Sequence, residues 1–320
     1  EKKDNNIFIG ARNKEFTIEL LKSGNHNFEI ITNQGRGVFG LIKELIIQQI
    51  KIKKIIKKYC IDIMLQIGGI HNAPIGKLLG IPTLALSDTE NEKWGNRISF
   101  PLSKHVFSPD CFNLDMGGSW KNQITYPSYH ELSYLTPLKI GEVKKPKNRF
   151  LIRFVEWQAG HDIGETSLSV SQKITIVNIL NEYGRCYISS EGALPRELKE
   201  YAWTSHASGI HKFMKDCKLI IGESATMASE AACMGIPAIF ISNTGRGYTT
   251  EQDQKYGLIK HFKLDQWKEI LNTVHYWAST DMYEEWQLKR KKMLKDKIDV
   301  TAWMVDVIEN YPRNIDSTNR

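Results

Sequence analysis

Residues 218–242 read KLIIGESATMASEAACMGIPAIFIS. Two short apolar runs, 219–221 and 238–241, are typical of buried strands. Between them, residues 227–234 are rich in helix formers, and Gly235 predicts the end of that helix. Because so few residues join the two runs, this stretch predicts a strand–turn–helix–strand unit of a parallel sheet.

The turn inside this unit, residues 222–226, predicts an anion site. The first N–H groups of a helix lack intrahelical acceptors, and the helix dipole favours negative charge there. Ser224 and Thr226 add hydroxyls, and Glu230, one helical turn later, could reach the hydroxyls of a ribose. We therefore expect a nucleoside diphosphate, although the same residues could act only as helix caps. Glu223 would repel a diphosphate unless its carboxylate points away or meets a hydroxyl.

Length and composition bound the class of protein. A chain of 320 residues suggests two domains, and its 41% apolar and 25% charged residues are ordinary for a soluble globular protein. Five scattered cysteines without a C-x-x-C pair favour reduced thiols, a cytoplasmic location and no structural zinc. No apolar run has transmembrane length. We find no nucleic-acid motif, so nucleic acid is not an expected partner.

The net charge of +7 is concentrated in residues 43–58 and 289–297, both on helical patterns. Solvated helix faces are the default interpretation. An acidic partner, either a nucleotide or an anionic membrane surface at the inner face of the membrane, is the minority interpretation. In residues 39–59 the apolar positions fit one face of a long helix, which we expect to pack on the core with its lysines in solvent.

Strand patterns alternate with helical patterns along the chain, which predicts an α/β fold. The strand candidates in the first half are residues 7–10, 28–32, 63–67, 83–86 and 106–108. Residues 127–147, rich in Pro, Gly and Lys, are typical of a linker. The alternation then restarts with strands at 150–155 and 185–189, and residues 267–311 form a helical tail.

We therefore predict two Rossmann-like domains, each a doubly wound parallel sheet, which face one another across a cleft. The first covers residues 1–146 and the second residues 147–320, with C-terminal helices that could pack back on the first. Residues 1–4 resemble the end of a charged helix, and a domain of this kind begins with a strand before that helix. We thus expect a first strand and helix to precede Glu1.

Polar side chains follow two of the predicted strands of the first half. Gly68 and Gly69 come after residues 63–67, and paired glycines allow a ligand to approach the backbone closely. His71, just beyond them, is a candidate base or a capping residue. Asp88 and Glu90 follow the next strand and are candidates for a general base or a hydroxyl clamp, with a cap or a surface acid as the alternative.

In the second half, His161 and Asp162 follow the strand at 150–155, a pair that suits capping as well as catalysis. A histidine beside a bound phosphate would be held protonated and could stabilise a leaving diphosphate. Ser190, Glu191 and Gly192 end the next strand and could contact base or ribose. The histidines show no metal-ligand spacing, so we expect neither a metal nor another cofactor.

Several of these stretches resemble a known superfamily. Residues 68–74, 79–82 and 88–90, with Asn96, resemble the acceptor half of MurG, the peptidoglycan N-acetylglucosaminyltransferase. Residues 222–237 resemble the donor-binding half of the same GT-B superfamily. The whole chain is still more similar to an uncharacterised group within it, domain-of-unknown-function family 354. The stretches that carry this similarity are residues 87–90, 129–135, 153–155, 161–164, 189–195 and 226–231.

The resemblance implies a GT-B fold in which Glu230 holds the nucleotide ribose and residues 224–226 hold the diphosphate. One departure is Gly222-Glu223-Ser224, where such enzymes usually have Gly-Gly or Ser-Gly. The expected nucleotide-sugar side comprises Arg153, Asp162, Ser190, Glu191, Gly192, Gly222, Glu223, Ser224, Ala225, Thr226 and Glu230. The acceptor side comprises Gly68, Gly69, His71 and Asn96, and the catalytic candidates are Asp88, Glu90 and His161.

Three functions fit these expectations. The first is a glycosyltransferase that moves a sugar from a nucleoside diphosphate sugar to a glycan or lipid-linked acceptor, and the superfamily implies polysaccharide or surface-glycan synthesis. The second is a sugar-nucleotide 2-epimerase, which needs carboxylates on both faces of the sugar. The third is a sugar-nucleotide-binding protein without catalysis.

Overall fold

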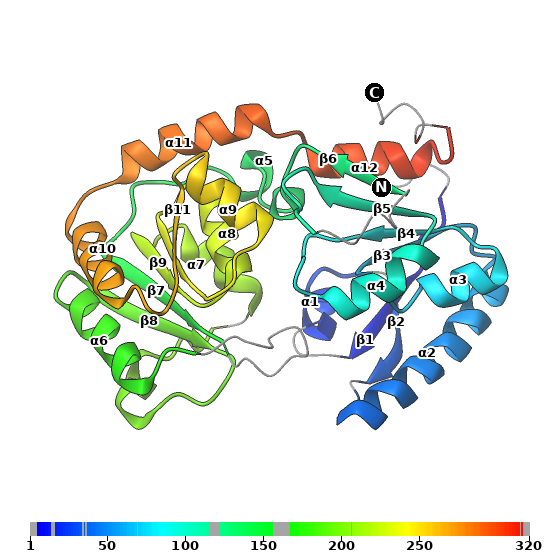
Figure 1. Ribbon diagram of the computed structural model, residues 1–320, viewed down its shortest axis with the longest axis horizontal. Helices are drawn as coiled ribbons and strands as arrows, with labels where there is room; N and C mark the ends of the chain where they lie inside the picture. The colour runs from blue at the N-terminus through cyan, green and yellow to red at the C-terminus, as the bar shows by residue number, and fades with distance from the viewer. Residues whose placement is uncertain are drawn as a thin grey trace.

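The computed structural model describes residues 5–13, 17–33, 35, 37–68, 70–114, 122–155, 167–205, 207–313 and 315. It consists of two α/β domains that lie side by side (Figure 1), which confirms the predicted fold class. The helices are α1 (Thr17–Ser23), α2 (Gly37–Tyr59), α3 (Ala73–Leu79), α4 (Lys93–Leu102), α5 (Pro137–Ile140), α6 (Val170–Asn181), α7 (Ile210–Met214), α8 (Ala225–Met234), α9 (Gly247–Gln254), α10 (Trp267–Ser279), α11 (Tyr283–Asp296) and α12 (Val300–Glu309). Three 3-10 helices are η1 (His130–Ser133), η2 (Arg196–Tyr201) and η3 (Ala207–Gly209).

The second domain is built on a five-stranded parallel sheet with the order β11-β10-β9-β7-β8. Its strands are β7 (Arg149–Phe154), β8 (Arg185–Ser190), β9 (Leu219–Gly222), β10 (Ala238–Ile241) and β11 (Ile259–Phe262). The chain leaves β7 towards β8 and returns to β9 on the other side, so the strand order reverses between β7 and β9. Ligands of open α/β sheets bind outside the carboxyl ends of the strands at such a reversal.

The first domain contains a four-stranded parallel sheet with the order β3-β4-β5-β6. Its strands are β3 (Met64–Ile67), β4 (Thr83–Leu86), β5 (His105–Pro109) and β6 (Gln123–Tyr126). In the described part of the chain, β1 (Ile9–Asn13) and β2 (Phe28–Asn33) pair with each other as a separate two-stranded parallel sheet. Strand β3 therefore forms one edge of its sheet, beside β1 in Figure 1.

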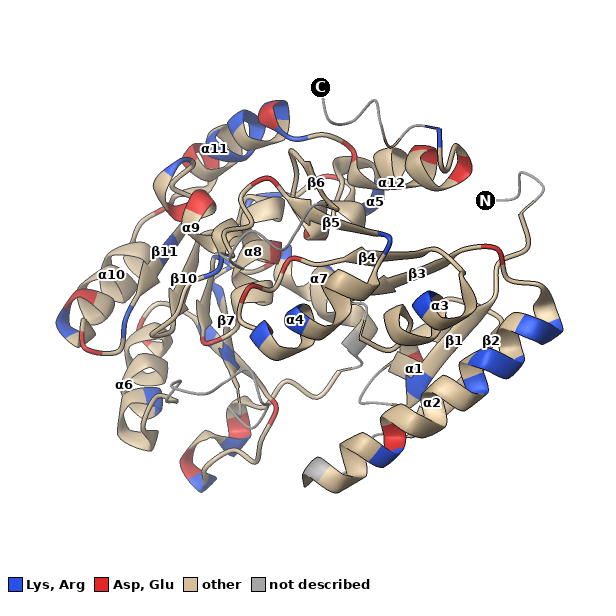
Figure 2. Cartoon of the chain, turned by 45° about the vertical axis from the view of Figure 1, so that its right-hand side comes forward, with Lys and Arg blue, Asp and Glu red and all other residues tan. Residues whose placement is uncertain are grey.

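Helix α2 ends at Tyr59 as predicted and begins two residues before the predicted range, but its packing differs from the prediction. Ile52 and Ile56 are buried against Met64 of β3. Ile46 and Ile50, on the expected core face, remain 57% and 53% exposed. Lysines lie along the same helix (Figure 2). The apolar pattern thus predicted the helix correctly and overestimated how much of it the core covers.

The segment predicted as a linker, residues 127–147, connects the two domains and packs on the second one. It contains η1 and α5, and four of its apolar side chains are buried in the core of the second domain: Tyr129, Leu132, Leu135 and Val143. The hydroxyl of Tyr129 also donates to Glu251 of α9 at 2.6 Å. The connection is therefore anchored to the second domain by packing and by a hydrogen bond.

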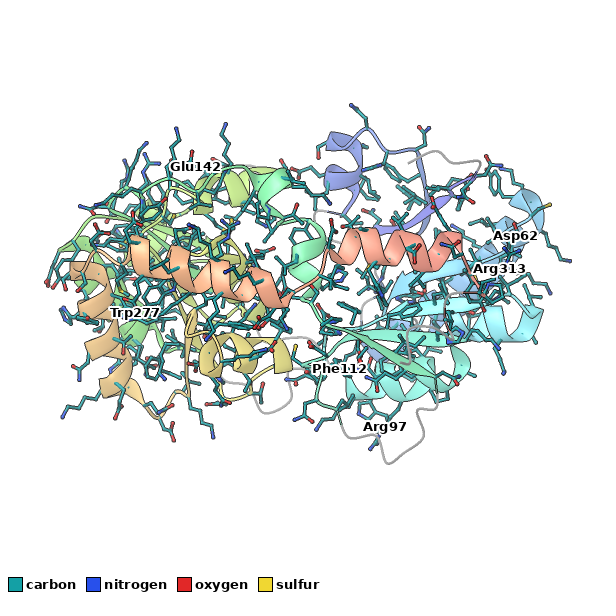
Figure 3. The ribbon with its side chains drawn as sticks, turned by 90° about the horizontal axis from the view of Figure 1, so that it is seen from above. Asp62, Arg97, Phe112, Glu142, Trp277 and Arg313 are labelled. Carbon is teal, nitrogen blue, oxygen red and sulfur yellow. The ribbon has the colours of Figure 1, made fainter. Side chains whose placement is uncertain are left out.

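The helical tail spans both domains. Figure 3 shows α11 and α12 following one another across them. In α11, the Arg290 Nε donates to the carbonyl of Cys233 at the end of α8, at 2.8 Å. Val300 and Val307 of α12 pack against Phe107 of the first domain. None of the helices in the described ranges is long and apolar enough to span a bilayer.

Candidate functional site

The turn from β9 to α8 opens at the strand-order reversal. Gly222 has φ +155°, and a Cβ there would lie 2.0 Å from the carbonyl oxygen of Arg153, so only glycine allows β7 to come this close. Ser224 caps α8, because its Oγ accepts from the amide of Met227 at 3.3 Å. Ala225 and Thr226 occupy the first two helical positions, and Thr226 is exposed. This is the helix N-terminus that the sequence predicted, open to a ligand.

Glu223 points away from this turn, which corrects its assignment to the nucleotide-binding side. Its side chain is 1% exposed. Its Oε1 accepts from the Leu168 amide and the Ser167 hydroxyl, both at 2.7 Å, and its Oε2 accepts from the Val155 amide at 3.1 Å. The carboxylate therefore fixes the segments around the loop after β7 and does not oppose a diphosphate at α8.

Glu230 lies one turn further along α8 and is 9% exposed. Its Oε1 accepts from the Tyr134 hydroxyl at 3.0 Å and lies 2.9 Å from the Nε2 of His211. The sequence suggested neither partner, because one comes from the connecting segment and the other from α7. Within the described ranges, the side-chain hydrogen bonds of Glu230 go to Oε1, so the carboxylate is held in one orientation and Oε2 is the oxygen that could meet a ribose.

Other predicted residues of the nucleotide side lie at the ends of β7 and β8. The Arg153 Nη2 forms an ion pair with the Glu191 Oε1 at 2.6 Å, and its Nη1 donates to the Ser189 hydroxyl at 2.8 Å. Ser190 and Gly192 are half-buried beside them. His161 and Asp162 lie outside the described residues.

On the first domain, Glu90 follows β4 and is 7% exposed. Its Oε1 accepts from the amides of Gly247 at 2.9 Å and Asn113 at 3.2 Å, whereas its buried Oε2 has no partner in the described part of the chain. Burial raises the pKa of the Glu90 carboxyl. Asp88 is half-buried and accepts from the Thr89 hydroxyl at 2.9 Å.

The described acceptor-side residues have different surroundings. Asn96 is 1% exposed and donates to the Thr89 carbonyl at 3.0 Å, so it supports the loop after β4 from inside and is not placed to touch a ligand. Burial, followed by the charge of Arg12, lowers the pKa of His71. Gly68 has φ +79° and ends β3, as the turn requires. Gly69 lies outside the described residues.

Glu131, in η1, was not singled out from the sequence as a site residue. It is 2% exposed, and its Oε2 has no partner in the described ranges. Burial raises its pKa to about 8, and the charges of Asp88 and Glu230 act in the same direction. The structure thus brings carboxyl groups of the first domain, the connecting segment and α8 near one another.

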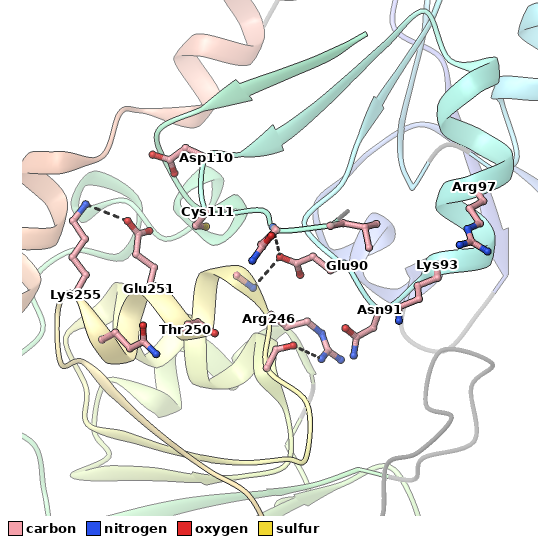
Figure 4. Close-up of a pocket in the computed structure, with 15 residues that line it drawn as sticks. Glu90, Asn91, Lys93, Arg97, Asp110, Cys111, Arg246, Thr250, Glu251 and Lys255 are labelled. Carbon is pink, nitrogen blue, oxygen red and sulfur yellow. Dashed lines mark hydrogen bonds and ion pairs between the residues drawn. The ribbon is translucent and has the colours of Figure 1, made fainter. Parts of the chain in front are cut away.

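A pocket of about 880 Å³ lies between the domains. Its walls come from the loops after β4, β5 and β10 and from helices α4 and α9 (Figure 4). Glu90 is the predicted residue that lines it. The sequence analysis missed the others, including Lys93, Arg97 and Arg246. Arg246 lies between two glycines in the loop that joins β10 to α9, and this Gly-Arg-Gly sequence after a predicted strand could have indicated it.

Asp110, Cys111 and Glu251 place possible metal ligands within 4.8 Å of one another in this pocket. However, the ammonium of Lys297 already lies 3.3 Å from Asp110 and 2.8 Å from Glu251. Burial also raises the pKa of the Cys111 thiol, which disfavours the thiolate that a metal needs. The donor set therefore fits an internal ion-pair network better than a metal site.

No family model and no curated protein matches the sequence. Among solved structures, the chain is similar to MurG of Acinetobacter baumannii, at 17% identity and a TM-score of 0.53 over 91% of this chain and 87% of that one. It is similar to the glycotransferase of kitacinnamycin at 12% identity and 0.57, over 94% and 90%. The chain has the GT-B fold.

A third similar structure is the UDP-GlcNAc 2-epimerase of Methanocaldococcus jannaschii in complex with UDP-GlcNAc and UDP. It shares 12% identity and a TM-score of 0.53, over 90% of this chain and 98% of that one. Proteins named as transferases and as epimerases thus share this fold, so the fold alone does not decide between the two activities for this chain.

Proposed function

We propose that this protein transfers a sugar from a nucleoside diphosphate sugar to an acceptor hydroxyl. The observation that carries the proposal is the open N-terminus of α8 at the strand-order reversal of the second domain. The amides of its first turn and the exposed Thr226 suit a diphosphate, and the fixed carboxylate of Glu230 suits a ribose. UDP and UDP-GlcNAc bound to a protein of the same fold support the ligand class.

The neighbouring pocket supplies room for an acceptor. It borders the carboxyl end of β10, the strand paired with β9. The unpartnered Oε2 of Glu90 could take the proton of the acceptor hydroxyl as that oxygen bonds to the anomeric carbon. The bond from that carbon to the diphosphate breaks, and the nucleoside diphosphate leaves with the bonding electrons. The N-terminus of α8 stabilises its negative charge.

Glu90 suits the role of base better than Asp88. Glu90 lines the pocket and its Oε2 is unpartnered, whereas Asp88 lies outside the pocket wall. The raised pKa of the Glu90 carboxyl brings it closer to neutral pH, where a general base works best. His161, the predicted partner of the leaving group, stays a prediction.

The 2-epimerase is the second candidate, because a protein with this fold has that activity. An epimerase needs no acceptor but needs acid and base groups around the sugar. Glu191, a carboxylate at the end of β8, is ion-paired with Arg153 at 2.6 Å. The interdomain pocket leaves room for an acceptor, which an epimerase would not bind, and this room favours transfer. Release of an epimerised sugar without acceptor would favour the epimerase.

We propose that the reaction belongs to polysaccharide or surface-glycan synthesis and takes place at the inner face of the membrane. Helix α2 supports the membrane location, because the exposed side chains of Phe39 and Ile42 lie on this helix together with many exposed lysines. Such a surface suits an anionic bilayer. Membership of family 354 stays a prediction from the sequence motifs.

Thermal-shift measurement against nucleoside diphosphates tests the proposal, because a ligand that binds the folded state raises its melting temperature. One nucleoside diphosphate should stabilise the protein more than pyrophosphate, which lacks the ribose. Glu230→Gln is the matched variant, since its amide oxygen can still accept from Tyr134. It should reduce the shift given by the nucleotide and leave that of pyrophosphate unchanged. No shift with any nucleoside diphosphate would reject the proposed donor site.

A further inference from the structure

The interdomain pocket has a cationic end. Lys93 and Arg97 project from α4 and Arg246 precedes α9 (Figure 4). Arg246 is 9% exposed, and its Nη1 donates to the Thr244 hydroxyl at 3.1 Å and the Gly245 carbonyl at 3.0 Å, which are neutral. Within the described ranges, we find no carboxylate in ion-pair contact with any of these three cations.

The Asn91 amide lies against the same guanidinium. With its oxygen turned toward Arg246, it accepts from the Nη1 at 2.6 Å and also from the Thr244 hydroxyl. This contact holds Arg246 at the pocket wall without neutralising it. A buried guanidinium with only neutral partners retains its full charge and is costly to bury unless an anion can approach it.

The acidic residues at the opposite end of the pocket are already paired. Asp110 and Glu251 both meet Lys297, whose side chain is 1% exposed. Glu251 also accepts from Tyr129 and pairs with Lys255. Lys93, Arg97 and Arg246 are therefore lining cations without an ion-pair partner in the described ranges, and the charge of Arg246 also acts on the Glu90 carboxyl.

The orphaned Oε2 of Glu90 is a second and independent sign of a ligand. Glu90 is 7% exposed and lines the pocket, and a buried oxygen without a donor is costly. A hydroxyl of a bound molecule would supply the missing donor. The site thus offers an acceptor for a hydroxyl and, beside it, cations for an anionic group.

We propose that this pocket binds an acidic sugar, in which a phosphate or carboxylate meets Lys93, Arg97 and Arg246 while a hydroxyl meets Glu90. The inference rests on the proposed function and deepens it: the acceptor is an anionic saccharide. Phosphate and carboxylate share this chemistry, so both are tested. Arg97 and Lys93 act as binding residues, and Glu90 receives the proton of the hydroxyl that they position.

Thermal shifts with glucose, glucuronate and glucose 6-phosphate test the inference at equal concentration and ionic strength. At least one of the two acidic sugars should raise the melting temperature by about 2 °C or more, and glucose should not. The double variant Lys93→Gln/Arg97→Gln should lose this shift. The matched control is Lys53→Gln/Lys57→Gln, with the same charge change and the same spacing on an exposed helix face; it should keep the shift.

The outcomes separate the inference from the proposed function. Equal shifts for glucose and both acidic sugars, or an acid-specific shift that survives in Lys93→Gln/Arg97→Gln, would overturn the acidic acceptor. Inorganic phosphate that reproduces the whole effect of glucose 6-phosphate would also overturn it, because the sugar would then contribute nothing. The nucleoside diphosphate shift is measured in the same variant and should persist; its absence from the wild-type protein would count against the donor site and not against this pocket.

Discussion

The Oε1 of Glu90 accepts a hydrogen bond from the amide of Gly247 at 2.9 Å, across the boundary between the two domains. Gly247 is the first residue of α9, so the carboxylate also lies at the positive end of that helix. A Cβ at position 247 would lie 1.9 Å from the carbonyl oxygen of Cys111 and 2.6 Å from the same Glu90 oxygen. The two domains therefore approach each other here as closely as a glycine allows.

Gly247→Ala should accordingly force the two domains apart at this contact. We expect the free energy of unfolding to fall by about 1–3 kcal/mol, as for other overpacked positions. Chemical denaturation measures the change. Gly209→Ala is the control, because a Cβ there meets no atom within 4 Å and the residue has helical backbone angles. Equal stability of Gly247→Ala and the wild-type protein would show that the contact is looser in solution.

The pH dependence of transfer tests Glu90 as the base. The carboxyl must be ionised to take a proton, and burial raises its pKa. The rate should therefore rise with pH through a pKa above the ordinary carboxyl range and then level off. Glu90→Gln should lower kcat by roughly 10²–10⁴-fold and remove this acid limb. If Asp88→Asn removes the limb while Glu90→Gln retains it, Asp88 is the base instead.

Glu223 should matter for stability and not for ligand affinity. Glu223→Ala leaves the amides of Val155 and Leu168 without their acceptor, and each unpaired donor costs about 1–3 kcal/mol. Glu223→Gln keeps one acceptor oxygen and should lose less. Urea unfolding gives the stabilities, and calorimetric titration gives the nucleotide affinity. A folded Glu223→Gln protein with greatly altered nucleotide affinity would place this side chain in the binding site after all.

We predict that the buried carboxyl of Glu131 makes the stability of the folded protein depend on pH. Its pKa is raised from 4.5 to about 8 by burial, so between these values the folded protein holds a proton that the unfolded chain has lost. Stability should therefore fall as pH rises from about 4.5 to about 8. Glu131→Gln removes this contribution. The melting temperature of the variant, relative to that of the wild-type protein, should therefore increase as pH rises. Melting curves from pH 5 to 9 measure this difference in melting temperature. A difference that stays constant over this range would contradict a protonated, buried Glu131.

The strand–turn–helix–strand unit of residues 218–242 could be predicted because its signals are local. The apolar runs became β9 and β10, and the cap by Ser224 let α8 begin two residues earlier than expected, at Ala225. The strands β6 and β11 were missed, because Gln123, Thr125, Lys260 and His261 interrupt their apolar patterns.

The candidate site was less predictable, since distant segments decide it. The orientation of Glu223 depends on residues of another loop, and that of Glu230 on Tyr134 and His211. The pocket exists only because the loop with Glu90 meets Gly247, 157 residues away. No local pattern reports such a contact.

Binding of a nucleoside diphosphate at the start of α8 is tested most directly by titration calorimetry on two variants of one exposed residue. Thr226→Asp adds a negative charge where the diphosphate should lie, yet favours the helix dipole, so the fold should not weaken. Thr226→Asn has nearly the same shape without the charge. The account predicts affinity at least about tenfold weaker for Thr226→Asp than for Thr226→Asn. Equal affinities, with both proteins folded, would contradict it.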